Sequence, residues 1–107
     1  MSDTHPLDRL FATIVARKGG DPSASYTAKL LSEGVERCAR KFGEEAVETI
    51  IAAMSGDKHA IAAESADVLY HLAVLLAATG VTLNDVYAVL NAREGQSGLA
   101  EKASRKR

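Results

Sequence analysis

The chain has 107 residues, of which 47% are hydrophobic and 25% charged, with a formal net charge of −1. This length and balance predict one globular domain and exclude a disordered chain. The near-neutral charge, the low aromatic content of 5% and the absence of Trp argue against a nucleic-acid-binding protein.

Five helical segments and no strands are predicted from the spacing of apolar residues and the placement of Gly and Pro. In chain order they span about Pro6 to Arg17, Ser25 to Glu33, Val35 to Met54, Asp57 to Thr79 and Thr82 to Arg93. A capping-box pattern opens the last segment at Thr82 and Asp85. An all-α bundle is therefore expected over residues 1–95, followed by a weakly ordered basic tail over residues 96–107.

The N-terminus shows no targeting segment, because charged side chains stand where a secretory signal needs an apolar run. The single cysteine, Cys38, cannot form an intrachain disulfide, which fits a reducing compartment, and its helical context predicts a packing role. Residues 60–79 are rich in Ala, Leu and Val, but Glu64, Asp67 and His71 interrupt them. The uncharged run that follows is too short to span a bilayer. A soluble, cytoplasmic protein without a membrane partner is expected.

The segment KFGEEAVE, residues 41–48, concentrates charge on the third predicted helix. At about 100° per residue, its charged side chains share one narrow stripe, formed by Lys41, Glu44, Glu45 and Glu48. Taken alone, the stripe is typical of an amphipathic helix with a solvated acidic face. No cation stands four residues after Glu44 or Glu48, so the stripe carries some repulsion unless it meets a cation.

The fourth predicted helix carries Glu64, Asp67 and His71 on one face but is otherwise apolar nearly all round. Such a helix is normally buried, and buried carboxylates must be protonated, be paired or bind a metal. A single chain of this length has too few other helices to bury the fourth on every side. The sequence therefore predicts a homodimer with this helix in its core and the active site near the interface.

The simplest arrangement sets the acidic stripe of the third helix against Glu64 and Asp67, antiparallel across the Ser55-Gly56 turn. Four or five converging carboxylates require divalent cations, and an all-oxygen donor set selects Mg²⁺ first and Mn²⁺ second. Because waters and substrate phosphates commonly complete the coordination of these ions, the pattern predicts phosphate chemistry. It does not identify the phosphate compound.

The pattern Glu-Glu-x-x-Glu at 44–48 followed by Glu-x-x-Asp at 64–67 resembles the paired motif of the all-α nucleotide pyrophosphohydrolases, the MazG-like superfamily. Over about Leu7 to Arg93 the chain also resembles the phosphoribosyl-ATP pyrophosphohydrolase family, through SYT at 25–27, KFGEEAVE at 41–48, ESADVLYHL at 64–72 and Leu90-x-x-Arg93. This resemblance implies a Mg²⁺-dependent homodimer in histidine biosynthesis. The implied reaction, the second step of that pathway, hydrolyses phosphoribosyl-ATP to phosphoribosyl-AMP and pyrophosphate.

By position, the resemblance implies that the metal ligands are Glu45, Glu48, Glu64 and Asp67. Glu44 stands beside them as a further ligand or as the base, and a carboxylate at the edge of the cluster, such as Glu48, can accept a proton from the attacking water.

Four residues are candidates for binding the substrate. Lys41, one turn before Glu44, is placed to hold a phosphate. Arg93 could do the same or could stabilise a helix end. Tyr26 and Thr27 open a helix after a Gly/Pro loop, where phosphate contacts are common, although their binding role rests on the resemblance.

His71 and Tyr70 are expected first as core or dimer contacts.

Two other functions stay open. One is a related house-cleaning enzyme that hydrolyses non-standard nucleoside triphosphates with the same metal site and a different base pocket. The other is a non-catalytic helical interaction module with a merely solvated acidic stripe. In that case Mg²⁺ would change neither the melting temperature nor any hydrolytic activity.

Overall fold

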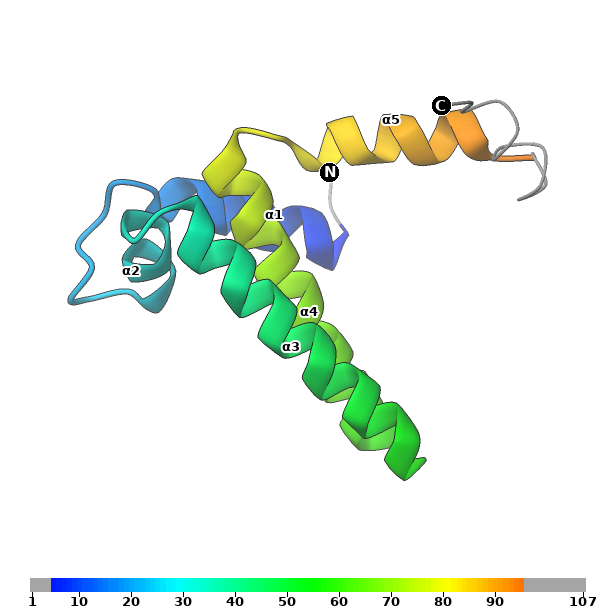
Figure 1. Cartoon of the computed structure of the whole chain (residues 1–107). Coiled ribbons are helices and arrows are strands. Elements are labelled where there is room, and N and C mark those ends of the chain that lie inside the picture. Colours follow the sequence, from blue (N-terminus) through cyan, green and yellow to red (C-terminus); the bar gives the residue numbers. More distant parts are fainter. Residues whose placement is uncertain (1–4, 96–107) are drawn as a thin grey trace.

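The structure, a computed structural model, describes residues 5–95 and contains five α-helices and no strand within that range (Figure 1). The helices are α1 (Pro6–Arg17), α2 (Tyr26–Ser32), α3 (Val35–Ser55), α4 (Lys58–Thr79) and α5 (Leu83–Arg93). The predicted all-α class is confirmed, and each predicted segment agrees with its helix to within one residue at each end. The expected tail, residues 96–107, lies outside the described residues.

Local signals in the sequence explain where the helices begin and end. The Asp57 carboxylate accepts a hydrogen bond from a backbone N–H of the first turn of α4. Thr82 and Asp85 form the predicted capping box at the start of α5, with hydrogen bonds of 3.0 and 2.9 Å. Gly56 and Gly80 follow α3 and α4 with φ of 73° and 80°, a left-handed conformation that glycine adopts without strain.

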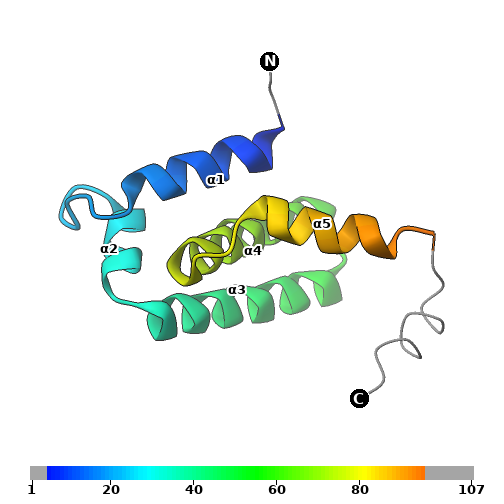
Figure 2. The same cartoon turned by 90° about the horizontal axis from the view of Figure 1, so that it is seen from above.

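The core lies at one end of an antiparallel pair formed by α3 and α4. α1 packs along the C-terminal half of α4 on the side away from α3, and α2 bridges α1 and α3 (Figure 2). Ile14, Leu30, Cys38 and Val74, one from each of these four helices, are at most 1% exposed. We call this four-helix part the closed end of the pair.

Two contacts strengthen the closed end. The Cys38 thiol donates a hydrogen bond to the Leu30 carbonyl at 3.3 Å, and burial raises the pKa of this thiol. The predicted packing role of Cys38 is therefore confirmed. The Lys18 ammonium donates to the Ala77 carbonyl at 3.0 Å, which ties the loop after α1 to the last turns of α4.

The remainder of the pair, residues 44–55 of α3 and 58–67 of α4, extends as two helices alone, and we call it the open end (Figure 1). α4 was expected to be buried on every side, but within one chain this holds only for its C-terminal half. The buried residues of α4 are His71, Ala73, Val74 and Ala77. Ala62, Ala63 and Ala66 are exposed because α1 and α2 cover the closed end and little of the open end.

By length and composition alone, α4 could also be a membrane-spanning helix. The sequence prediction was that the charged residues in this stretch rule out a membrane span. The core helix of a soluble protein meets the same two conditions. The packing of its C-terminal half in the closed end is that of a core helix.

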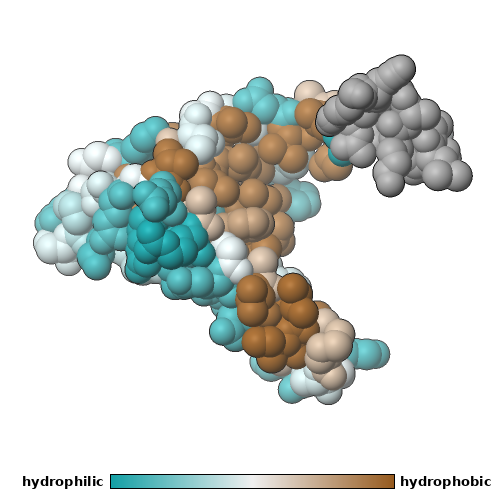
Figure 3. Space-filling model, viewed as in Figure 1, coloured by the Kyte–Doolittle hydropathy of each residue, from teal (hydrophilic) through white to brown (hydrophobic). Residues whose placement is uncertain are grey.

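Two apolar surfaces are left uncovered by the described residues. On α3, a stripe formed by Val47, Ile50, Ile51 and Met54 is 53–79% exposed, and Figure 3 shows an apolar patch towards the tip of the α3–α4 pair. We call these four residues the α3 stripe. On α5, Val89 and Leu90 are 47% and 57% exposed, because α5 runs away from the other helices (Figure 1).

Candidate metal centre

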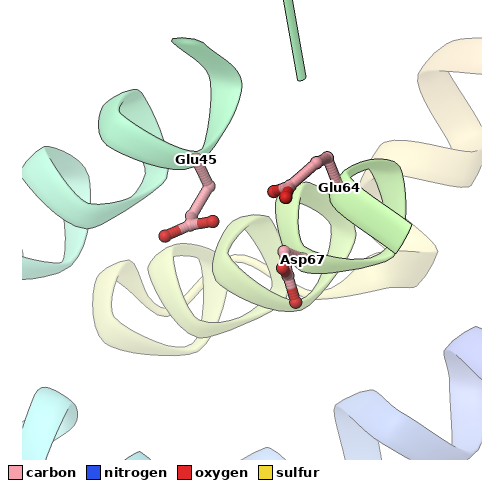
Figure 4. Close-up of side chains that lie close together, drawn as sticks. All are labelled: Glu45, Glu64 and Asp67. Carbon is pink, nitrogen blue, oxygen red and sulfur yellow. The ribbon is translucent and has the colours of Figure 1, made fainter. Parts of the chain in front are cut away.

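Three carboxylates converge between the two helices of the open end. Glu45 projects from α3, and Glu64 and Asp67 project from α4, around a shared space (Figure 4). One carboxylate oxygen from each residue lies within 4.8 Å of the other two. The predicted antiparallel facing of the acidic residues is confirmed for these three, and we call them the carboxylate cluster.

The close approach of α3 and α4 at this level depends on small and hydroxyl-bearing side chains. Ala52 is buried between the helices, at 7% exposure. The Thr49 hydroxyl lies 3.0 Å from the Glu45 carbonyl and 3.1 Å from the Glu64 carbonyl, so it bridges the two helices beside the cluster. Thr49 is not among the site residues predicted from the sequence. The available signal was a hydroxyl one turn after Glu45, at the edge of the acidic stripe.

The electrostatics of the cluster favour a bound cation. Partial desolvation raises the pKa of Glu64, and the charges of Asp67, Glu48 and Glu45 raise it further. Among the described residues, no ion pair involves Glu64 or Asp67. Ionised carboxylates held this close together therefore repel one another unless a cation lies between them.

Lys41 stands at the edge of the cluster on the α3 side. Its ammonium lies 3.3 Å from a Glu44 oxygen and 3.8 Å from a Glu45 oxygen. The hydrogen bond from Lys41 to Glu44 raises the lysine pKa, so the side chain stays charged at neutral pH. Lys41 thus places one positive charge beside the carboxylates, where a phosphate could also reach it.

Two predicted acidic residues lie outside the group of three. Glu44 is turned towards Lys41, and its side chain is 52% exposed. Glu48 is exposed on α3, yet it is close enough to raise the pKa of Glu64. Its role as a metal ligand, and the roles of both residues in proton transfer, stay predictions.

The donor set fits a hard divalent cation. The three converging ligand atoms are all carboxylate oxygens, with no sulfur or imidazole nitrogen among them. Mg²⁺ and Mn²⁺ prefer oxygen donors, and Mg²⁺ usually binds to only one or two protein carboxylates with waters and phosphates completing its shell. The partly exposed cluster leaves room for such outer ligands.

An aromatic group borders this site on the α2 side. Tyr26 is 53% exposed and lies close enough to Lys41 to contribute to the rise in the lysine pKa. Its ring meets the His71 ring edge to face, with centroids 6.4 Å apart. The Thr27 hydroxyl is hydrogen-bonded to the Tyr70 hydroxyl, which ties α2 to α4. Tyr26 is thus the more accessible of the two predicted substrate contacts on α2.

His71 links the aromatic group to the cluster through the backbone of α4. It is 6% exposed, and its Nδ1 lies 2.9 Å from the Asp67 carbonyl, so Nδ1 must carry the proton. The Tyr70 ring packs against it at 4.8 Å. The core role expected for His71 and Tyr70 is confirmed, while their expected role at a dimer contact stays a prediction.

Arg93 is the one predicted site residue that the fold carries away from the cluster. It lies in the last turn of α5, and α5 diverges from the α3–α4 pair of its own chain (Figure 1).

The chain is similar to known proteins over most of its length. The profile of the PRA-PH family, phosphoribosyl-ATP pyrophosphohydrolase, matches residues 7–94. A phosphoribosyl-ATP pyrophosphatase of Cereibacter sphaeroides is 66% identical over 99 residues, which cover 92% of this chain and 96% of that protein. One from Paracoccus denitrificans is 61% identical over 108 residues, covering 99% of this chain and 100% of its own length.

The five helices and the matching family profile together place the chain among the all-α pyrophosphohydrolases. The family match spans all five helices and both acidic motifs. The chain belongs to the phosphoribosyl-ATP pyrophosphohydrolase family.

Proposed function

We propose that the chain hydrolyses phosphoribosyl-ATP to phosphoribosyl-AMP and pyrophosphate, the second step of histidine biosynthesis, with Mg²⁺ as its cofactor. The observation that carries the proposal is the carboxylate cluster, which lies inside the segment matched by the family profile. The names of relatives that are 61–66% identical to this chain support the same substrate.

The chemistry of the donors supports Mg²⁺, with Mn²⁺ as a substitute. Glu45, Glu64 and Asp67 would hold the ion, and Glu48 stands near enough to join them. When bound, Mg²⁺ neutralises phosphate charge and makes a water more acidic. Desolvation raises the pKa of Glu64, and the neighbouring carboxylates raise it further; a positive ion would relieve the repulsion among these carboxylates.

Other residues of the chain would accept the proton of the attacking water and bind the substrate. Glu44 and Glu48, at the edge of the cluster, are the candidates for accepting the proton of the attacking water. As the water attacks, the phosphoanhydride bond between the α- and β-phosphorus atoms breaks, and the leaving group keeps the electron pair of that bond. Lys41 would hold a phosphate oxygen, and the exposed Tyr26 ring beside it would form one wall of the substrate site.

A cytoplasmic homodimer is part of the proposal. The α3 stripe supports it, since fully burying each such side chain contributes about 1.5–3 kcal/mol and these are now more than half exposed. The exposed alanines on the N-terminal half of α4 point to the same missing neighbour. The free, buried Cys38 fits a reducing compartment such as the cytoplasm.

Product analysis tests the reaction. The protein is incubated with phosphoribosyl-ATP, with Mg²⁺ and then with excess EDTA, and in parallel with a panel of canonical and non-standard nucleoside triphosphates. Equal amounts of phosphoribosyl-AMP and pyrophosphate are expected with Mg²⁺ alone. Faster turnover of a triphosphate from the panel would indicate a house-cleaning enzyme. Absence of all hydrolysis, together with a melting temperature that Mg²⁺ does not change, would indicate a non-catalytic module.

Analytical ultracentrifugation tests the dimer. The native chain is expected to sediment at twice the monomer mass at the concentrations used in the assay. A stable, active monomer would contradict this part of the proposal and leave the reaction unaffected.

A further inference from the structure

Lys41 is shared between two carboxylates that differ in exposure. Its ammonium lies 3.3 Å from a Glu44 oxygen and 3.8 Å from a Glu45 oxygen. The side chains of Lys41 and Glu45 are only 19% and 18% exposed, whereas that of Glu44 is 52% exposed. The lysine therefore has one partner inside the site and one at its edge. Because the ammonium stands on a flexible four-carbon stem, rotation of that stem can favour either partner.

Glu45 also belongs to the carboxylate cluster. Its carboxylate converges with those of Glu64 and Asp67, with one oxygen of each residue within 4.8 Å of the other two. A divalent cation held by these three groups would share the Glu45 carboxylate with the Lys41 ammonium. The two positive charges would then repel each other at close range. Lys41 and a cation at the cluster therefore compete for the same carboxylate.

Glu44 offers the ammonium another place. It is the nearer of the two partners of Lys41, and it is not one of the three converging residues. Because its side chain is about half exposed, an ammonium held beside it can be reached from solvent. An ammonium has three N–H donors, so Lys41 can donate to Glu44 and to a phosphate oxygen at the same time. Movement away from Glu45 would therefore bring the lysine to where a phosphate can bind.

We propose that the Lys41 ammonium leaves Glu45 when the cluster binds a divalent cation, and pairs with Glu44 and a substrate phosphate instead. The charge of Lys41 then opposes cation binding and assists substrate binding. Its removal should change the two affinities in opposite directions. The inference rests on the metal site of the proposed function, and binding measurements without substrate separate the two.

Titration with Mn²⁺ tests the competition directly. Binding is followed by electron paramagnetic resonance, in which the signal of free Mn²⁺ falls as the ion binds to the protein. Lys41→Met is expected to bind Mn²⁺ about 3- to 10-fold more tightly than the wild type, because a nearby positive charge is gone. The difference should shrink as the ionic strength rises, since salt screens the repulsion. Lys41→Arg keeps the charge and should bind Mn²⁺ with nearly wild-type affinity.

The matched control is Arg40→Met. It removes a positive charge from the neighbouring position of α3, where the Arg40 guanidinium lies 3.5 Å from the exposed Glu36. The Mn²⁺ affinity should change by less than about twofold, because this charge is exposed and screened. An equal gain in Arg40→Met and Lys41→Met would reduce the effect to net charge and overturn the inference. Equal or weaker binding by Lys41→Met would also overturn it, because Lys41 would then orient Glu45 for the cation.

A double-mutant cycle tests the exchange between the two partners. Glu44→Gln removes the alternative partner of Lys41, so the ammonium should stay at Glu45 and Mn²⁺ should bind more weakly. In the Lys41→Met background the same substitution removes only the charge of Glu44, and the loss of affinity should be smaller. Equal losses in the two backgrounds would mean that the residues act independently, which would overturn the exchange.

Steady-state kinetics at saturating Mg²⁺ test the second role of Lys41. Lys41→Met should raise the KM for phosphoribosyl-ATP by about 10-fold or more, because a hydrogen bond between charged groups is lost. An unchanged KM would overturn phosphate binding by Lys41. If the wild type does not hydrolyse phosphoribosyl-ATP but Lys41→Met still binds Mn²⁺ more tightly, the proposed reaction fails and the competition stands. A wild-type chain that binds no Mn²⁺ would overturn both.

Discussion

The two ends of the α3–α4 pair differ in what one chain can complete by itself. At the closed end, four helices bury Ile14, Leu30 and Val74 to 1% exposure or less. At the open end, the same two helices expose Met54 to 79% and hold Glu45, Glu64 and Asp67 close together. The buried core that stabilises the fold lies at the closed end, and the candidate metal ligands lie at the open end. A helix pair can therefore be stabilised at one end while the other end keeps mutually repelling groups.

The repulsion at the open end is a cost that the closed end must offset. Desolvation and the like charges nearby raise the pKa of Glu64, so the ionised carboxylate lowers the free energy of unfolding. Functional sites commonly carry such a cost in stability. If the two ends are separable in this way, substitutions at one end should change activity and those at the other should change stability.

The largest effect is expected from Asp67→Ala at the open end. Removing a carboxylate of the cluster should lower the rate of pyrophosphate release by at least about 100-fold, because even residues that only orient metal ligands cost 10–100-fold. The melting temperature should stay the same or rise, since one source of repulsion is gone. Initial rates and thermal melts followed by circular dichroism measure both. Glu36→Ala, at an exposed position of the same α3 helix that faces away from the cluster, should change neither. Full activity of Asp67→Ala would show the metal assignment to be wrong.

Ile14→Ala at the closed end should reverse this pattern. Ile14 is 1% exposed, so the substitution leaves a cavity and should lower the free energy of unfolding by about 2–5 kcal/mol. Urea denaturation measures the change. Below the melting temperature, kcat should stay near the wild-type value. Thr13→Ala, at the neighbouring exposed position, should change the stability by about 0.5 kcal/mol or less. A loss of kcat without a loss of stability would contradict the assignment of stability to the closed end and activity to the open end.

Glu64→Gln tests whether the ionised carboxylate at the open end lowers the stability of the fold in a pH-dependent way. A raised pKa means that the folded chain holds this proton more tightly than the unfolded chain. Without Mg²⁺, the ionised Glu64 therefore destabilises the fold at neutral pH, and this effect fades as pH falls through the raised pKa. Glu64→Gln should melt at the same or a higher temperature than the wild type at pH 7 without Mg²⁺. It should also gain less stability when Mg²⁺ is added.

Thermal melts between pH 5 and 8, with and without Mg²⁺, provide the measurement. The carboxylate of Asp85 serves as an internal contrast. Its hydrogen bonds to Thr82 lower its pKa, so its contribution to stability is lost only as pH falls below the ordinary carboxyl range, outside this window. An equal Mg²⁺-induced shift in wild type and variant would count against Glu64 as a ligand.

The smallest effect is expected from Tyr70→Phe. It removes the hydrogen bond to the Thr27 hydroxyl and should lower the free energy of unfolding by about 0.5–1.5 kcal/mol. Because Tyr26 and the cluster keep their other contacts, kcat should change little. The matched control is Tyr87→Phe on α5, which removes an exposed hydrogen bond to Asp8 on α1. It should lower the free energy of unfolding by less. A large loss of kcat in Tyr70→Phe would give the hydroxyl pair a direct role in the reaction.

Features that depend only on nearby residues could be predicted from the sequence. Helix ends follow from Gly56, Gly80 and the Thr82–Asp85 box, because caps and left-handed turns involve contacts over only a few residues. The facing of Glu45 towards Glu64 and Asp67 also followed, since helical periodicity and a short antiparallel turn leave few other arrangements.

Which surfaces stay uncovered could not be predicted from the sequence, because it depends on how the helices pack. Periodicity describes the faces of a helix, but it does not say how far a neighbouring helix extends. The short α1 and α2 cover mainly the closed end, so one face of the N-terminal half of α4 and the α3 stripe remain exposed. The bridge made by Thr49 and the divergence of α5 with Arg93 likewise depend on contacts and directions between segments far apart in the chain. Contacts between segments far apart in the chain therefore place the buried core at the closed end and the candidate site at the open end.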